Sequence, residues 1–203
     1  MQLITLKQSW TDYLKYGRRL FFKKKSYIFQ QGHIGTGFYY IYKGIVKIIS
    51  DTPGGGKRIL DFVGPGVLAG EIDHLPYFCS AVCHEDCVVY YFSEQDYHNL
   101  IQIHPEVTIL FAESLILKEK LLLNNINVTS TSTESQIAQS LLYLMNSLES
   151  KEINLTQQEL SFYTGLTRIT IYKFLKIWAS EGIVLISNRR IYIVDPKALK
   201  EIK

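Results

Sequence analysis

The stretch that decides the fold is LTQQELSFYTGLTRITIYKFLKIWASEGIV, residues 155–184. Thr156 followed three residues later by Glu159 has the spacing of a capping box, which predicts the start of a short helix. Gly165 supplies a tight turn, and Thr167 is placed to cap a second helix. Two short helices joined by so tight a turn are typical of a helix–turn–helix.

The second of these helices has two different faces. Its apolar residues recur at helical spacing and are expected in the core: Ile171, Phe174, Leu175 and Trp178. The outward residues are mostly basic or polar: Arg168, Ile169, Thr170, Tyr172, Lys173 and Lys176. In a helix–turn–helix the start of the second helix enters the major groove, where Arg and Lys can donate two hydrogen bonds to guanine. The outward face therefore predicts contact with double-stranded DNA.

Phosphate contacts are expected around this face. Threonine hydroxyls and helix N-terminal amides can hold phosphate oxygens, and basic side chains neutralise their charge. The stretch GIVLISNRRIYIVD, residues 182–195, predicts a β-hairpin with Asn188, Arg189 and Arg190 at its tip, a wing that could lie along the DNA backbone. The candidate phosphate contacts are Thr156, Thr167, Thr170, Lys176, Arg189 and Arg190.

Composition and charge agree with this interpretation. The chain has 203 residues, 47% of them hydrophobic and 20% charged, which suits a folded protein of one or two domains. The net charge is +3, but residues 151–203 carry nine basic and five acidic side chains, so +4 lies there and −1 in residues 1–150. Such a distribution is expected where one part of a chain meets a polyanion. No apolar run reaches the roughly 18 residues of a membrane span. The start, MQLITLKQSW, lacks a signal-peptide pattern, so we expect a cytoplasmic protein without membrane contact.

A long helix and a hinge are predicted before this stretch. The segment EVTILFAESLILKEKLLLNNINV, residues 106–128, contains neither Gly nor Pro. One row at heptad-type spacing predicts a dimer seam: Leu110, Ser114, Leu117, Leu121 and Val128. A second apolar row, Ile109, Ile116 and Leu123, is expected to pack on the chain's own β domain. The Ser/Thr-rich residues 128–135 are the hinge candidate, after which Thr133 and Gln136 predict a capping box.

The N-terminal half has the pattern of a β domain. Between about Phe22 and Ser93, short runs rich in Ile, Val, Tyr and Phe alternate with glycines that mark turns. After Ser93 the pattern becomes helical, and Pro105 interrupts it. The sequence predicts an α+β chain in three parts: a β sensor domain over 1–105, a dimerisation helix over 106–128, and a winged helix–turn–helix over 129–203.

This order of parts resembles the CRP/FNR family of bacterial transcription regulators. The resemblance runs from about Lys25 to Val194 and includes IFQQG, FYYIYKGIVKI, ILDFVGPG, the pair Gly70–Glu71, QIAQSLLYL and LTQQELSFYTGLTRITIYKFLK. It implies an N-terminal double-stranded, jelly-roll-like β-roll, a long dimerisation helix and a C-terminal winged helix–turn–helix. It also implies a homodimer on a pseudo-palindromic operator, with RNA polymerase as a candidate partner and no enzymatic activity.

By position, the resemblance assigns base reading to Arg168, Ile169 and Lys173. Members that bind cyclic AMP have a glutamate between two arginines there, so Ile169 and Lys173 are departures. Glutamate accepts a hydrogen bond from cytosine, whereas isoleucine offers only an apolar contact, for example to a thymine methyl group. We therefore expect a half-site that differs from that of the cyclic AMP receptor.

The effector region departs further from members that bind cyclic nucleotides. In GEIDHLPYFCSAV, residues 70–82, Ser80 remains from the Arg-Ser pair that holds the phosphate, but Cys79 replaces the arginine. Leu121 and Leu122 match the Thr-Ser pair that meets adenine. Without the bidentate arginine, cyclic AMP is not expected, although a cyclic-nucleotide-responsive regulator stays an alternative. An unidentified apolar or aromatic small molecule would contact Gly70, Glu71, His74, Ser80, Leu117 and Leu121, unless these residues only fill an interface.

Three cysteines leave a redox- or metal-gated regulator as another alternative. Cys79, Cys83 and Cys87 are too few for a disulfide framework, and an iron–sulfur cluster normally needs four ligands. They are more simply explained as small buried apolar residues, so no metal or cofactor is expected. The histidines are scattered, and no nucleophile–base pair or two-carboxylate arrangement emerges, so we do not expect an enzyme.

Overall fold

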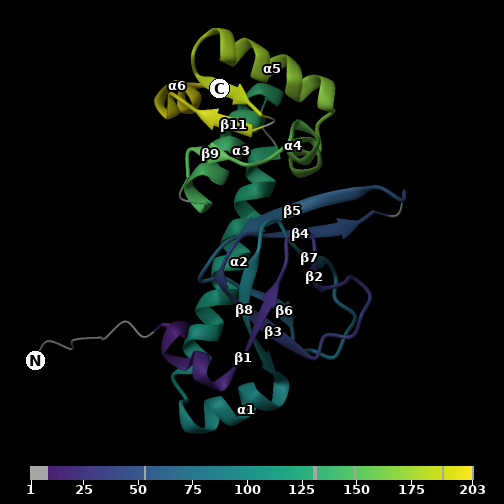
Figure 1. The fold of residues 1–203 in the computed structure, drawn as a ribbon, viewed down its shortest axis with the longest axis vertical. Helices are drawn as coiled ribbons and strands as arrows, with labels where there is room; N and C mark the ends of the chain where they lie inside the picture. Colours follow the sequence, from purple (N-terminus) through teal and green to yellow (C-terminus); the bar gives the residue numbers. More distant parts are fainter. Residues whose placement is uncertain (1–8, 53, 130–131, 149, 189, 203) are drawn as a thin grey trace, which may run out of the picture. The chain divides into compact units, whose positions relative to one another are not determined.

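Figure 1 shows the chain in a computed structural model, which describes residues 9–52, 54–129, 132–148, 150–188 and 190–202. Within these ranges, the side chains of residues 121, 122 and 124–129 also lie outside the description. The chain forms two compact units. The first comprises Met1–Val46 and Gly64–Lys120, and the second comprises Lys47–Val63 and Leu121–Lys203.

The first unit is built mainly of antiparallel strands. Its elements are η1 (Trp10–Tyr16), β1 (Arg18–Phe22), β2 (Tyr27–Phe29), β3 (Gly37–Lys43), β6 (Leu68–Glu71), β7 (Ser80–Cys83), β8 (Cys87–Ser93), α1 (Glu94–Ile103) and the first part of α2 (Val107–Thr129). One sheet has the order β1-β8-β3-β6, and β2 pairs with β7. The predicted jelly-roll-like β domain is confirmed, although η1 and most of β1 precede Phe22, where the strand pattern was expected to begin.

Aromatic side chains form the core of the first unit. Phe38 of β3 and Phe92 of β8 are paired across the sheet, and their rings stack at 5.2 Å between centroids. Trp10 of η1 meets both rings edge-on at 5.5 and 5.7 Å. Leu100 and Val107 belong to the same buried cluster, so this core fixes α1 and the start of α2 on the sheet.

The second unit contains the helix–turn–helix. Its elements are β4 (Val46–Asp51), β5 (Lys57–Val63), α3 (Thr133–Ser147), β9 (Glu152–Ile153), α4 (Gln157–Thr164), α5 (Arg168–Ser180), β10 (Val184–Ser187), β11 (Arg190–Ile193) and α6 (Pro196–Glu201). The strand order β10-β11-β9 forms a small sheet, and β4 lies beside β5. Leu141, Leu160 and Leu175 of the three successive helices are fully buried, which gives this unit its own core. The predicted winged helix–turn–helix, and with it the α+β class, is confirmed.

The N-cap of α3 is Ser132, whose hydroxyl accepts the backbone N–H of Ser135, so the predicted cap at Thr133 is wrong by one residue. Within the described ranges, no helix has both the length and the apolar character needed to cross a membrane.

Candidate DNA-binding surface and effector region

The first helix of the motif, α4, begins as the sequence predicts. The Thr156 hydroxyl accepts the Glu159 N–H at 3.1 Å, and the Glu159 carboxylate accepts the Thr156 N–H at 3.0 Å. These reciprocal bonds satisfy two of the donors that a helix start leaves unpaired. Thr156 is therefore held at the N-terminus of α4, where the free amides favour an anion.

The turn between α4 and α5 depends on Gly165. Its φ of 76° lies in the left-handed region, which glycine adopts without a steric penalty. The Ser161 hydroxyl donates to the Leu166 carbonyl at 2.6 Å and closes the turn from the side of α4. A buried bond from the Gln136 amide of α3 to the Thr164 carbonyl, at 2.8 Å, ties the same turn to the core. The position of α5 is thus fixed from α3 and α4.

The recognition helix α5 has a buried apolar face and an exposed, mostly basic or polar face, as expected. Thr167 caps it by accepting the Thr170 N–H at 3.2 Å. Ile171, Leu175 and Trp178 are at most 1% exposed, and Phe174 is half-buried. The residues on the other side are exposed: Arg168, Ile169, Tyr172, Lys173 and Lys176. Ile169 is 81% exposed, so it contributes almost nothing to the core and is free to meet a ligand.

A groove of about 570 Å³ lies beside the start of α5. It is lined by Thr156, Gln157, Gln158, Arg168, Ile186 and Ile191, which come from α4, α5 and the wing strands. Gln157 and Gln158 were missed by the sequence reasoning. Their position directly after the capping Thr156 was the available signal, because residues at a helix start point to the same anion site as its amides. Amide side chains can contact phosphates or adenine, so both join the candidate surface.

The wing is a hairpin, as predicted, but Arg190, expected at its tip, begins strand β11 and is already paired. Asn188 connects β10 to β11 with a φ of 49°, a left-handed turn conformation. The Arg190 guanidinium forms an ion pair with Glu152 of β9. Arg190 is therefore exposed but not free, and a phosphate would have to compete with Glu152. Arg189, also predicted to contact phosphate, lies outside the described residues.

In the described part of α2, two residues of the predicted seam contact their own unit, and the second apolar row is exposed. Leu110, assigned to the dimer seam, packs against the aromatic core of its own unit. Ser114, also assigned to the seam, donates to the Leu110 carbonyl at 2.8 Å and accepts from the Trp10 indole at 3.3 Å. The second row is the exposed one: Ile109 at 64%, Ile116 at 49% and Leu123 at 53%. Leu117 is also exposed, at 46%, whereas the side chains of Leu121 and Val128 lie outside the described part.

Ser80 is engaged within the protein. Its side chain is buried at the start of β7, and its hydroxyl accepts the Gln31 backbone N–H at 2.9 Å. Gly70 has a φ of 95°, and a Cβ there would lie 3.0 Å from the Gly37 carbonyl oxygen, so the close approach of β6 to β3 requires glycine. Gly70 is thus explained by packing, and the Ser80 hydroxyl supports the backbone at Gln31.

A cation not foreseen from the sequence lies near Cys79. Lys118 of α2 is half-buried and interacts electrostatically with Glu71 and Cys79. Burial lowers the pKa of the Lys118 ammonium, while the Glu71 carboxylate opposes this shift. Burial raises the pKa of the Cys79 thiol to about 11, so this thiol is neutral at pH 7. Lys118 had no sequence signal other than a charge within an apolar helix.

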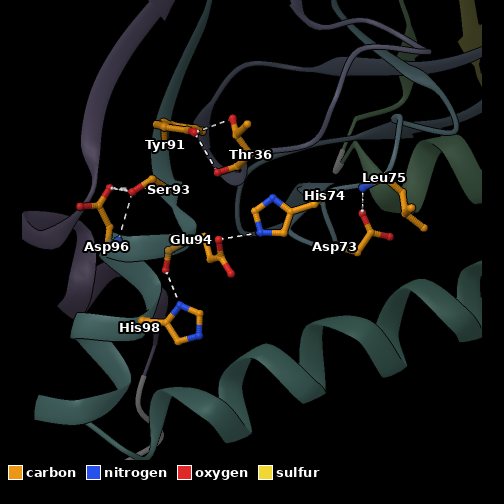
Figure 2. A network of polar contacts seen from close by, with 9 residues as sticks. All are labelled: Thr36, Asp73, His74, Leu75, Tyr91, Ser93, Glu94, Asp96 and His98. Carbon is orange, nitrogen blue, oxygen red and sulfur yellow. Dashed lines mark hydrogen bonds and ion pairs between the residues drawn. The ribbon is translucent and has the colours of Figure 1, made fainter.

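His74, predicted for the same pocket, points elsewhere. Its Nε2 lies 2.7 Å from a carboxylate oxygen of Glu94 at the start of α1, as Figure 2 shows. The residue is exposed and has a φ of 59°, and the neighbouring Leu75 N–H donates to Asp73 at 3.0 Å. His74 therefore fixes the β6–β7 loop to α1.

The cysteines are free thiols with the character of core residues. Cys83 and Cys87 are fully buried, and a hydrogen bond between their thiols raises the pKa of Cys83. The Cys87 thiol also lies 3.3 Å from the Glu85 carbonyl oxygen. Among the residues that the structure describes, no group of three or more His, Cys, Asp and Glu side chains could hold a metal ion.

The chain combines a β-roll with a winged helix–turn–helix whose recognition helix is exposed and basic. This combination defines the class of DNA-binding transcription regulators with an N-terminal sensor domain. The family model described as cyclic nucleotide-binding domain matches residues 19–104, and that described as Crp-like helix-turn-helix domain matches residues 135–202. The chain belongs to the CRP/FNR family of transcription regulators. This family consists of regulators rather than enzymes, and its members bind DNA and are dimeric.

Individual relatives agree. The cyclic AMP receptor protein of Thermus thermophilus is 28% identical over 195 residues, which cover 93% of this chain and 89% of the relative. The CRP-like cAMP-activated global transcriptional regulator of Mycobacterium tuberculosis is 25% identical over 183 residues, covering 85% and 82%. Among solved structures, FixK2 from Bradyrhizobium japonicum has a TM-score of 0.80 at 17% identity, with 92% and 97% coverage. A CRP/FNR family regulator from Thermus thermophilus has a TM-score of 0.79 at 24% identity, covering 91% and 97%, and both structures share the fold.

Proposed function

We propose that this regulator is a homodimer that binds a pseudo-palindromic DNA operator and responds to a small-molecule effector other than cyclic AMP. The observation that carries the proposal is the exposed start of α5, where Arg168, Ile169 and Lys173 project from a helix held by a buried opposite face. Arg168 can pair with guanine and Ile169 can contact a methyl group. Two such helices in a dimer would meet half-sites about 34 Å apart.

The exposed apolar row of α2 supports the dimer. Ile109, Ile116 and Leu123 recur every seven residues and are about half exposed or more. A heptad row of this kind is buried when two helices pack side by side. We therefore assign the dimer seam to this row, together with Leu117, in place of Leu110 and Ser114.

The effector region supports a ligand other than cyclic AMP. A neutral thiol, Cys79, stands where the resemblance expects a phosphate-binding arginine. Lys118 is the cation of this region, and it comes from α2 rather than from the β-roll. An effector that contacts Lys118 would act directly on the helix proposed to form the dimer.

The test of DNA recognition compares Arg168→Ala with Lys200→Ala, because both residues are exposed cations and only Arg168 lies on α5. An operator is first selected from a random duplex pool with the full-length wild-type protein. Arg168→Ala should lose about 1–3 kcal/mol of operator affinity and accept other bases at one position of each half-site. Lys200→Ala should bind like wild type. Equal losses of Arg168→Ala on operator and on random DNA would contradict base reading.

A further inference from the structure

The β4–β5 hairpin belongs to the N-terminal domain by sequence but to the DNA-binding unit by contact. Its residues, Lys47–Val63, lie within the stretch that matches the cyclic nucleotide-binding domain, residues 19–104. In the structure they form one compact unit with α3, α4 and α5. The chain enters and leaves this hairpin through the strands β3 and β6. The hairpin is therefore linked through the chain to the strands β3 and β6, and through non-covalent contacts to the helix–turn–helix.

Among the described residues, the hairpin is held to the helices by several interactions, and we call three of them together the hairpin contact. Lys47 of β4 and Glu159 of α4 form an ion pair at 2.9 Å, with both side chains only 21% exposed. Phe62 of β5 is 1% exposed and meets the ring of Tyr163 of α4 edge-on at 5.8 Å. Asp61 accepts from the Tyr143 hydroxyl of α3 at 3.4 Å. The hairpin thus touches both helices that carry the recognition helix.

One residue joins the hairpin contact directly to the DNA-binding surface. The Glu159 carboxylate that pairs with Lys47 is the same group that caps Thr156, with bonds of 3.0 Å to its N–H and 3.1 Å to its hydroxyl. Thr156 lines the groove beside Arg168. Movement of the hairpin would therefore shift a carboxylate that fixes the start of α4.

The environment of Asp61 makes the hairpin contact sensitive to protons. The groups that face it are the Tyr143 hydroxyl of α3, which is also bonded to Ser147, and the Tyr163 ring of α4. The charged groups of the hairpin contact, Lys47 and Glu159, form an ion pair with each other. Burial raises the pKa of Asp61 from 3.8 to about 6, against the lowering effect of hydrogen bonds from the Phe62 N–H and from Tyr143. The pKa of Asp61 is raised only while the hairpin contact is formed, so the formed contact is more stable at low pH. This stabilisation is lost as the pH rises through 6.

We propose that the hairpin contact is a proton-sensitive control element, which tightens when Asp61 is protonated and loosens when it ionises. When the contact is formed, α4 and the residues of the groove are held in one arrangement. They therefore lose less conformational entropy when DNA binds. The hairpin would then raise operator affinity in mildly acidic conditions. Its effect on operator affinity depends on the proposed function, whereas the effect on the contact itself does not.

The experiment compares wild type with Asp61→Asn and with Asp51→Asn in the full-length protein. Asn keeps the acceptor for Tyr143 but cannot ionise, and Asp51 is an exposed carboxylate on the same hairpin. Amide hydrogen exchange of β5 and α4 is measured at pH 5.0 and 7.5 and corrected for the intrinsic rate. Wild type and Asp51→Asn should be about tenfold better protected at pH 5.0. Asp61→Asn should be equally protected at both values, and a wild-type pH dependence in this variant would overturn the proposal.

Operator affinity supplies the second measurement. At pH 7.5, Asp61→Asn should bind the selected operator several-fold more tightly than wild type, and at pH 5.0 the two should bind alike. Equal affinities at pH 7.5, with exchange behaving as expected, would overturn the control of DNA binding but leave the proton-sensitive contact standing. Failure of every variant, wild type included, to select any operator would instead count against the proposed function.

Discussion

At the scale of single residues, local chemistry explains why much of the DNA-binding surface was predictable. Thr156, Gly165 and Thr167 each act through a bond or a backbone angle within a few residues, so their spacing alone identified them. For Arg190 the sequence indicated a phosphate contact but not the ion pair, because its partner Glu152 is 38 residues away in the chain. Pairing over such a distance leaves no pattern in a single sequence.

Ile169 gives a prediction that can be tested one methyl group at a time. Replacing a thymine of the operator by deoxyuridine removes its methyl group and leaves its hydrogen bonds unchanged. If Ile169 covers that methyl, wild type should lose about 0.8 kcal/mol, roughly fourfold in affinity, at one position of each half-site. Ile169→Ala should show no difference between thymine and deoxyuridine there. A fourfold loss in both proteins would assign the methyl contact to another residue.

At the scale of elements, α2 shows where sequence periodicity reaches its limit. Both of its apolar rows have heptad spacing, and spacing cannot say which row faces the chain's own core. The deciding partner is Trp10, which bonds to Ser114 and belongs to a 3-10 helix that no pattern indicated. The hairpin contact was invisible for a similar reason, since Lys47 and Glu159 are 112 residues apart.

The assignment of the exposed row of α2 leads to a test of assembly. Ile116→Asp would place a charge at the centre of the proposed seam, so dimerisation should weaken by roughly 3 kcal/mol or more, over a hundredfold. Ile103→Asp, which changes an isoleucine of α1 that is 62% exposed, should leave assembly unchanged. Sedimentation equilibrium measures both. A monomeric wild type, or a dimeric Ile116→Asp variant at low concentration, would contradict this assignment.

At the scale of the whole molecule, the family and the order of parts could be predicted, but the effector region could not. Turn glycines and capping residues recur along the chain and define the fold, whereas a ligand site is assembled from distant positions. Glu71, Cys79 and Lys118 come from β6, the β6–β7 loop and α2. Only the folded chain brings them together, and Lys118 changes the charge expected of the region.

This arrangement predicts how the protein treats cyclic AMP. With the neutral thiol of Cys79 in place of the expected arginine, the cyclic phosphate lacks its bidentate donor, so 1 mM cyclic AMP should leave the thermal unfolding temperature unchanged. The control is the same titration with 1 mM AMP, which reveals a general effect of nucleotides. A rise in unfolding temperature specific to cyclic AMP would contradict this prediction and favour the cyclic-nucleotide-responsive alternative.

The ion pair between Arg190 and Glu152 affects how the regulator searches a genome. Attraction to arbitrary duplex comes almost wholly from unpaired cations, which displace the ions condensed on DNA. Because Arg190, one of the two wing arginines, is already paired, the wing adds less to that attraction than its formal charge suggests, and encounters with wrong sequences end sooner. The correct site, where base contacts provide the energy to exchange Glu152 for a phosphate, therefore gains a relative advantage that the wing's formal charge would not suggest.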